Sequence, residues 1–403
     1  MSFNPEAADW SPDTQAVRGG LDRTGFQETT EPIFLNSGFV YESAAAAERA
    51  FTGEDERFVY SRYGNPSVAT FQERLRLLEG TEACFATASG MSAVFTALGA
   101  LLGAGDRVVA ARSLFGSCFV ILNEILPRWG VETVFVDGPD LDQWRDALST
   151  PATAVFFESP SNPMQEIVDI AAVSGLAHAA GATVVVDNVF ATPLLQRCTD
   201  FGADVVVYSG TKHIDGQGRV LGGAILGSKE FIEGPVRQLM RHTGPALSAF
   251  NAWVLTKGLE TMSLRVNHAS ASALRLAEWL EAQPAVTWVK YPLLASHPQH
   301  ELAAKQMKSG GTVLTFELAS PAGRSAKDAA FGLLDGLRII DISNNLGDSK
   351  SLITHPATTT HRAMGPEGRA AIGLSDGVVR LSVGLEDPED LIRDLGQSLA
   401  RIQ

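Results

Sequence analysis

The chain has 403 residues, of which 45% are hydrophobic, and a formal net charge of −14. This composition is typical of a globular protein with two or more domains, and the charge argues against nucleic acid or an anionic membrane surface as a partner. No apolar run reaches the roughly 18 residues of a membrane span, and the first residues lack a secretion signal. Three scattered cysteines, Cys84, Cys118 and Cys198, exclude a disulfide framework and a paired-cysteine metal site. We therefore expect a cytoplasmic protein.

Residues 1–65 carry many polar and acidic positions, scattered glycine and proline, and little sustained periodicity. They are predicted to form an arm, with a helical turn at residues 44–47. Because the arm has no evident core of its own, we expect it to contact a neighbouring subunit.

From residue 83 onward, short β-rich runs alternate with amphipathic helical segments. Met91, Val94, Phe95, Leu98 and Leu101 follow the spacing of one buried helix face. The strand candidates are continuous apolar runs, so both their faces are covered, as in a parallel sheet. They span residues 83–88, 107–111, 132–136, 153–158, 183–187, 204–208 and 223–226. These runs predict a large α/β domain over residues 66–260, with a mostly parallel seven-stranded sheet and helices on both faces.

The pattern changes after residue 260. A helical segment at residues 273–282 precedes β-like runs at 286–292 and 311–318, and another helix, at 325–334, precedes a β-like run at 378–384. Helices and strands mixed in this way predict a smaller C-terminal α+β domain over residues 261–403.

Polar side chains follow two of the predicted strands. Asp187 ends one strand, and Ser209, Thr211 and Lys212 come at the end of the next, in the run SGTK. Ligands of an open parallel sheet bind beyond the carboxyl ends of its strands, so these side chains are expected to project toward one crevice. Taken singly, they could be a helix cap, turn residues and a surface lysine. A nucleotide P-loop is disfavoured because its glycine pattern is absent.

Together these side chains supply what pyridoxal phosphate requires. A lysine can form a Schiff base with its aldehyde, an acid can keep its pyridine nitrogen protonated, and hydroxyls can bind its phosphate. A phosphate cradle is predicted at Gly90 and Met91, where a helix begins and its free amides favour an anion. The alternative for Gly90 is a packing role at a tight turn. Tyr60 and Arg62 form a second candidate anion site.

Six motifs in order give the sequence a specific resemblance. YSRYGNPS, ASGMSA, ESPSNP, VVVDNVFATP, YSGTKHIDGQ and VRLSVGLED resemble those of the γ-subgroup of pyridoxal-phosphate enzymes, the synthases, lyases and sulfhydrylases of transsulfuration. The match runs from about Tyr60 to Asp387, nearly the whole chain. The resemblance implies fold type I of the PLP-dependent transferases and a homotetramer built as a dimer of dimers. No metal site is expected.

The resemblance also implies a role for each matched residue. Lys212 would be the lysine bound to the cofactor, Tyr60 a further catalytic residue, and Asp187 the partner of the pyridine nitrogen. Arg380 would bind the substrate α-carboxylate, with Ser343 nearby. The other implied cofactor ligands are Gly90, Met91, Ser209 and Thr211 at the phosphate, Tyr60 and Arg62 from the adjacent protomer, and Asn162 near the phenolic oxygen.

Three departures from the family pattern bear on the reaction. Phe115 stands where many relatives have a tyrosine, and it can stack on the cofactor but has no hydroxyl. Asn345 replaces a serine, and Lys350 replaces an acidic residue. Lys350 would suit an anion such as hydrosulfide or the distal carboxylate of a succinyl ester; the alternative is a surface lysine without a role in the site.

The resemblance, together with these departures, implies γ-replacement, in which O-succinylhomoserine and sulfide give homocysteine and succinate for methionine biosynthesis. The alternatives are a transferase that uses cysteine and forms cystathionine, or one that uses an O-acetyl ester. A lyase acting on cystathionine or methionine is disfavoured by Phe115 and Lys350. A protein that binds the cofactor without catalysis is disfavoured because the lysine, the acid and the phosphate ligands are all present.

Overall fold

In the computed structural model, which describes residues 3–320 and 323–402, the chain divides into two compact units. Unit 1 comprises Met1–Ala100, Val207–Asp215 and Arg219–Thr261. Unit 2 comprises Leu101–Val206, Gly216–Gly218 and Met262–Gln403.

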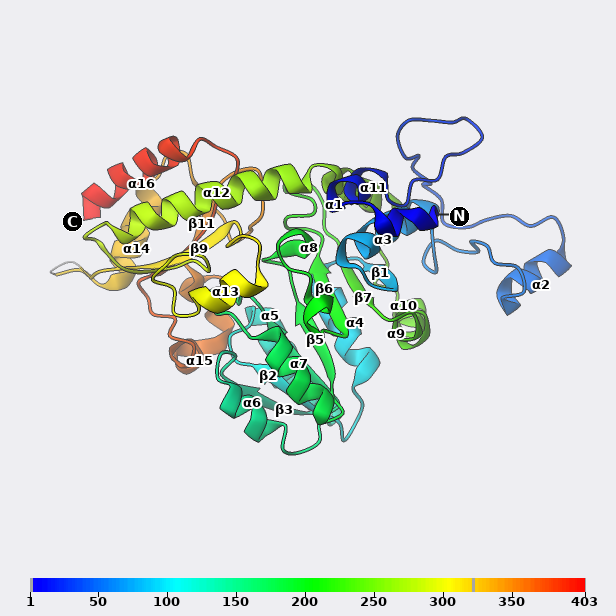
Figure 1. The fold of residues 1–403 in the computed structure, drawn as a ribbon, viewed down its shortest axis with the longest axis horizontal. Coiled ribbons are helices and arrows are strands. Elements are labelled where there is room, and N and C mark those ends of the chain that lie inside the picture. The colour runs from blue at the N-terminus through cyan, green and yellow to red at the C-terminus, as the bar shows by residue number, and fades with distance from the viewer. Residues whose placement is uncertain (1–2, 321–322, 403) are drawn as a thin grey trace. The chain divides into compact units, whose positions relative to one another are not determined.

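Seven strands form the larger sheet, in the order β1-β7-β6-β5-β4-β2-β3 (Figure 1). β2 pairs in parallel with β3 and β4, and β4 with β5, whereas β1 is antiparallel to β7. The strands are β1 (Ala83–Thr87), β2 (Arg107–Ala111), β3 (Glu132–Val136), β4 (Ala154–Glu158), β5 (Thr183–Asp187), β6 (Val205–Ser209) and β7 (Gly223–Gly227). All seven predicted strands are confirmed to within one residue at each end, and with them the predicted fold class.

Helix α3 (Pro66–Glu79) is the longest helix of unit 1 and begins at a well-formed cap. The Asn65 side chain accepts a hydrogen bond from the amide of Ser67, and Pro66 occupies the first turn, where no amide hydrogen is needed. α3 packs against β1 and α11 (Ala249–Glu260). The other helices are η1 (Pro5–Asp9), α1 (Pro12–Arg18), α2 (Ala44–Thr52), α4 (Gly90–Leu101), α9 (Lys229–Phe231), η5 (Ile232–Val236) and α10 (Arg237–Thr243).

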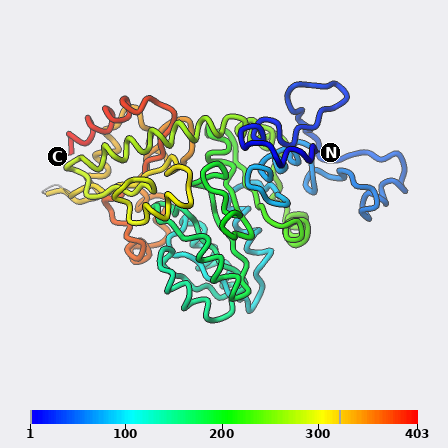
Figure 2. The backbone as a smooth tube through the Cα atoms, in the orientation of Figure 1, coloured from blue at the N-terminus to red at the C-terminus, as the bar shows by residue number. Residues whose placement is uncertain are grey.

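The chain between α1 and α3 forms an extended arm of unit 1. Figure 2 shows it as a long blue segment with one helix, α2, which contains the helical turn predicted at residues 44–47. Glu31 holds the arm to α3 and α11 through ion pairs with Arg74 and Lys257. Beyond this anchor, Phe26 and Val40 are 95% and 89% exposed. The arm thus carries apolar side chains that its own unit does not cover.

In unit 2, β2, β4 and β5 lie at the centre of the parallel strands because their side chains are almost all apolar and buried. The helices that connect these strands are short, and α7 packs against β5 and α6. They are α5 (Gly116–Val120), η2 (Ile121–Ile125), η3 (Leu126–Trp129), α6 (Leu141–Ala147), α7 (Ile170–Ala179), α8 (Thr192–Leu195) and η4 (Cys198–Phe201).

The C-terminal part of unit 2 contains a second, five-stranded sheet, in the order β10-β11-β12-β9-β8. Its strands are β8 (Val286–Lys290), β9 (Val313–Leu318), β10 (Asp341–Ile342), β11 (Leu352–Thr354) and β12 (Val378–Ser382). The helices and turns of this region are α12 (Met262–Glu281), α13 (His300–Gln306), α14 (Ala326–Gly336), η6 (Pro356–Thr358), η7 (Arg362–Met364), α15 (Gly365–Ala371) and α16 (Pro388–Ile402). The predicted smaller α+β region is confirmed, although α12 begins at residue 262, well before the predicted start at 273.

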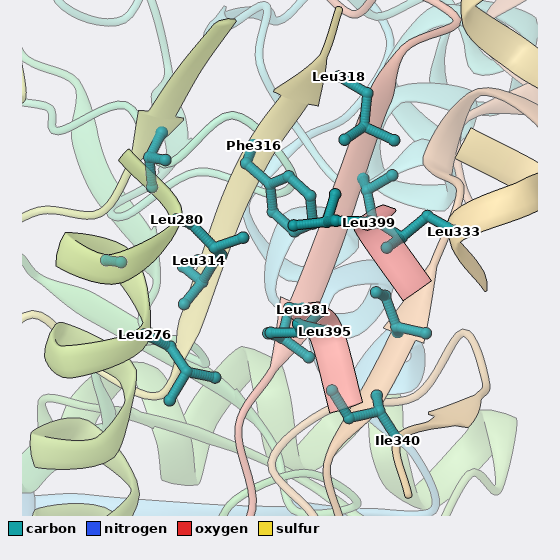
Figure 3. Packing of buried hydrophobic residues seen from close by; sticks show 14 of the residues in the cluster. Leu276, Leu280, Leu314, Phe316, Leu318, Leu333, Ile340, Leu381, Leu395 and Leu399 are labelled. Carbon is teal, nitrogen blue, oxygen red and sulfur yellow. The ribbon is translucent and has the colours of Figure 1, made fainter. Parts of the chain in front are cut away.

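A continuous apolar core joins this sheet to its helices (Figure 3). Leu314 and Phe316 of β9 and Leu381 of β12 contact leucines of α12, α14 and α16. The spacing of Leu391, Leu395 and Leu399 places one face of α16 against this core. Burial of these side chains fixes β12, the strand that carries Arg380.

The helices in the described part of the chain are too short or too polar to cross a membrane.

Candidate active site

In unit 1, the start of α4 forms a narrow cradle. The backbone amide of Ser92 donates to the Ser89 hydroxyl at 3.1 Å, which closes the first turn. A Cβ atom at Gly90 would lie 2.6 Å from the Cβ of Ser209. Only glycine fits this close approach, so the packing role of Gly90 is real. The same approach brings Ser209 to a helix N-terminus, where amides favour an anion.

Lys212 lies on a tight turn directly after β6. Its amide donates to the Ser209 carbonyl at 3.3 Å. The Thr211 hydroxyl donates to the Gly222 carbonyl at 3.4 Å and accepts from the Gly222 amide at 3.2 Å. The sequence order SGTK therefore places two hydroxyl groups and the lysine within one turn of unit 1.

Tyr60 and Arg62 lie at the end of the arm, in the same unit. Tyr60 is 41% exposed and forms an isolated bridge with Gly38. The Arg62 guanidinium donates to the Arg241 carbonyl and lies 5.3 Å and 4.8 Å from the ring centres of Tyr60 and Tyr63. This geometry keeps Arg62 among aromatic rings, and its role toward an adjacent protomer stays a prediction.

Asp187 is the last residue of β5, in unit 2. Its Oδ1 accepts a hydrogen bond from the Val189 amide at 3.0 Å. Burial raises the pKa of Asp187 to about 7. Such a carboxyl group is poised to ionise when a cation such as a pyridinium lies beside it.

Asn162 and Arg380 are joined by a hydrogen bond in unit 2, a contact that the sequence analysis did not predict. The Arg380 guanidinium donates to the Asn162 side-chain oxygen at 3.0 Å and to the Asn344 and Asn345 carbonyls at 2.9 and 3.3 Å. Arg380 is almost fully buried, and burial lowers its pKa to about 10. Its Nε atom is buried without a hydrogen-bond partner among the described residues. This unsatisfied donor fits an incoming carboxylate.

Ser343 and Asn345 lie beside Arg380, but Lys350 lies apart from this contact. The Ser343 hydroxyl accepts from the Asn345 amide at 3.3 Å, which shapes the turn whose carbonyls hold Arg380. The Lys350 side chain is 62% exposed, and its Nζ lies 3.5 Å from Asp348 Oδ1. The substrate role of Lys350 stays a prediction, and its exposure agrees equally well with the surface alternative.

Two further residues that touch the predicted site were not assigned from the sequence. Glu158 accepts the backbone amides of Phe115 and Asn162 at 2.7 and 3.1 Å. His361 is buried, and its Nε2 donates to the Asn162 carbonyl at 3.1 Å. Glu158 lies within the quoted motif ESPSNP and ends a strand as Asp187 does, a signal that could have revealed it. His361 offered no comparable signal.

The two groups of residues fit pyridoxal phosphate. Unit 1 provides a lysine, two neighbouring hydroxyl groups and a glycine at a helix N-terminus, which lets Ser209 approach closely. Unit 2 provides a carboxyl group with a raised pKa and a buried arginine with an unsatisfied donor. Lysine, acid and phosphate cradle are the protein groups that this cofactor needs.

The chain is similar to known proteins over almost its whole length. Residues 13–400 match the model of the family described as Cys/Met metabolism PLP-dependent enzymes. The chain is 70% identical to an O-succinylhomoserine sulfhydrylase of Mycobacterium tuberculosis, over 96% of this chain and 95% of the relative. It is 47% identical to one of Pseudomonas aeruginosa, over 97% and 95%. A crystal structure described as a putative O-acetylhomoserine (thiol)-lyase from Campylobacter jejuni, with N′-pyridoxyl-lysine-5′-monophosphate, matches with a TM-score of 0.92 and 30% identity, over 97% of this chain and all of the other.

Proposed function

Because the chain belongs to the Cys/Met metabolism family of PLP-dependent enzymes, we propose that it converts O-succinylhomoserine and sulfide to homocysteine and succinate, a step of methionine biosynthesis. Arg380 carries the assignment of an amino-acid substrate, because its buried Nε lacks a partner among the described residues. The sequence identity with two O-succinylhomoserine sulfhydrylases supports O-succinylhomoserine as the ester and sulfide as the second substrate.

When bound, pyridoxal phosphate stores the electron pair that remains on a carbon atom after its proton has left. We assign the binding of the phosphate to Gly90, Met91, Ser209 and Thr211. Asp187 holds the proton on the pyridine nitrogen through its negative charge. Lys212 would hold the aldehyde of the cofactor, and its amine would move protons at the substrate.

The substrate is held and changed by few groups of the protein. Arg380 binds the α-carboxylate through its buried guanidinium, and Asn162 keeps that guanidinium in place through their hydrogen bond. The Lys212 amine takes the proton from Cα, after which a second proton leaves Cβ. The C–O bond at Cγ breaks, and succinate leaves with the bonding pair. Hydrosulfide forms the new C–S bond at Cγ, and protons return to Cα and Cβ.

Phe115 supports replacement over cleavage. It occupies the N-cap of α5, where the backbone position is fixed by the Glu158 carboxyl group. Its ring can stack on the cofactor, but it offers no hydroxyl group for proton transfer. We therefore keep Phe115 as the stacking residue and Tyr60 as the further catalytic residue from the adjacent protomer.

The proposed assembly is a homotetramer made of two dimers, located in the cytoplasm. The exposed apolar side chains of the arm support contact with a neighbouring subunit. We also propose that the chain divides into an arm, a large domain and a small domain, with boundaries at residues 65 and 260. All three cysteines are buried and none forms a disulfide bond within the described residues, in agreement with a reducing compartment.

The proposal is tested by supplying the cofactor-loaded enzyme with O-succinylhomoserine and either sulfide or cysteine, and identifying the sulfur-containing product by mass spectrometry. We expect homocysteine from sulfide and little cystathionine from cysteine. O-acetylhomoserine in a parallel reaction measures the preference for the ester. Cystathionine as the dominant product would contradict the proposal and identify a synthase.

A further inference from the structure

Glu158 is the last residue of β4 and is 5% exposed. In the parallel register of β4 and β5 it lies opposite Asp187. Acceptor atoms of Glu158, Asp187 and Cys118 lie within 4.8 Å of one another. A second buried carboxyl group thus lies directly beside the predicted partner of the pyridine nitrogen.

The two oxygens of Glu158 bind two different segments. Oε1 accepts the amide of Phe115 at 2.7 Å, at the N-cap of α5. Oε2 accepts the amide of Asn162 at 3.1 Å. The side chain of Asn162 in turn accepts from Arg380. One carboxyl group therefore connects the residue predicted to stack on the cofactor ring with the residue that holds the substrate-binding arginine.

These contacts argue against a metal ion at the cluster of Cys118, Glu158 and Asp187. Both Glu158 oxygens already accept backbone amides, and burial raises the pKa of Cys118 well above its usual range, so the thiolate that a metal prefers is disfavoured. The cluster is better suited to hold protein segments than a cation.

The two carboxyl groups influence each other's ionisation. Burial, and next the charge of Asp187, raise the pKa of Glu158 well above its usual range. Two adjacent buried carboxyl groups do not readily ionise together. Burial and the charge of Asp187 thus oppose the ionisation of Glu158, whereas the two backbone amides that its oxygens accept favour it.

We propose that Glu158 is a positioning residue, which fixes Phe115 and Asn162 relative to Asp187 and so orients the cofactor ring and the Arg380 guanidinium. This inference rests on the proposed use of pyridoxal phosphate by the same residues. It assigns to Glu158 no contact with the substrate. Its loss is expected to change the orientation of the bound cofactor rather than the ability of the chain to fold.

The test compares Glu158→Gln with the wild-type holoenzyme. Glutamine keeps the shape of the side chain, but its NH2 group meets one of the two backbone amides, so that amide loses its acceptor. Three quantities are measured: the visible circular dichroism of the bound cofactor, its dissociation constant, and kcat and KM. The matched control is Glu166→Gln, a carboxyl group whose pKa burial also raises, but whose side chain interacts with Lys290 and Ser113, to which no role in the site is assigned.

We expect Glu158→Gln to weaken cofactor binding by about tenfold or more, the equivalent of one lost buried hydrogen bond. The visible circular dichroism should fall, and kcat should fall more than KM rises. Glu166→Gln should leave the dissociation constant and the circular dichroism unchanged. Equal cofactor spectra and dissociation constants in the two variants would overturn the proposal and reduce Glu158 to a structural residue.

Glu158→Asp decides the case if Glu158→Gln does not fold. The shorter side chain keeps both acceptors but draws them back, so its circular dichroism should also fall; a wild-type spectrum would contradict the proposal. The cofactor measurements need no substrate. If the wild-type enzyme makes no homocysteine but the variant still shows a changed cofactor spectrum, the proposed reaction is rejected and the role of Glu158 is retained.

Discussion

His361 shows at the residue scale how the surroundings of Asn162 depend on a neutral side chain. Burial, and next the charge of Arg380, lower the pKa of His361 to about 4 from 6.5. The native state thus binds fewer protons than the unfolded chain between these values. Stability that is present above pH 6.5 is therefore lost as the pH falls toward 4.

We predict that His361→Gln flattens this dependence. From pH 7 to pH 5, the His361 contribution to the free energy of unfolding should fall by about 2 kcal/mol in the wild type. The free energy of unfolding of the variant should therefore decrease over this range by about 2 kcal/mol less than that of the wild type. Denaturant unfolding at both pH values measures the difference. His297, whose pKa burial also lowers to about 4, leaves part of the slope in place. A slope as steep as that of the wild type would contradict the prediction; the exposed His242→Gln is the control.

Residue types and strand ends were enough to predict part of the site. Asp187 and Lys212 stand out because a carboxyl group and an amine follow apolar runs. The sequence did not reveal the contact between Asn162 and Arg380, since they are far apart in the chain and meet only through tertiary packing. Glu158 was missed although it ends a strand as Asp187 does, because the sequence does not show the two backbone amides that it accepts.

At the scale of elements, the arm is expected to be the main contact with a second copy of the chain. Val40→Asp should cost little stability in the isolated subunit, because this side chain is 89% exposed there. In a tetramer it would place a charge in an apolar interface, which is unfavourable.

We predict that Val40→Asp lowers the mass of the holoenzyme in sedimentation equilibrium. Since Tyr60 and Arg62 are proposed to reach the adjacent protomer, cofactor affinity should fall as the assembly dissociates. Ser37→Asp adds the same charge to an exposed polar position of the arm and should leave the mass unchanged. An unchanged mass for Val40→Asp would show that this part of the arm does not mediate assembly.

Elements with a strong pattern were predictable, and short or mixed ones were not. The apolar run of β5 gave its bounds without error, because a strand covered on both faces has few polar residues. β10 and β11 have only two and three residues, too few for any periodicity. The first turns of α12 were missed because small or polar residues such as Ala269, Ser270 and Ser272 form its buried face there.

For the whole molecule, family membership and the geometry of each unit lead to the same chemistry. Unit 1 carries Lys212 and the phosphate cradle, and unit 2 carries Asp187 and Arg380. We expect Lys212 to be the attachment point, because it follows the end of β6 and the hydroxyl groups of Ser209 and Thr211 that would bind the phosphate.

The most direct test of this account is to identify the lysine that binds the cofactor. The holoenzyme is reduced with sodium borohydride, which makes the bond to the lysine permanent, and is then digested and analysed by mass spectrometry. We predict that the peptide containing Lys212 carries the pyridoxyl phosphate group and that other lysine peptides do not. If the pyridoxyl phosphate group were found on a different lysine, or on no lysine, the account would be contradicted.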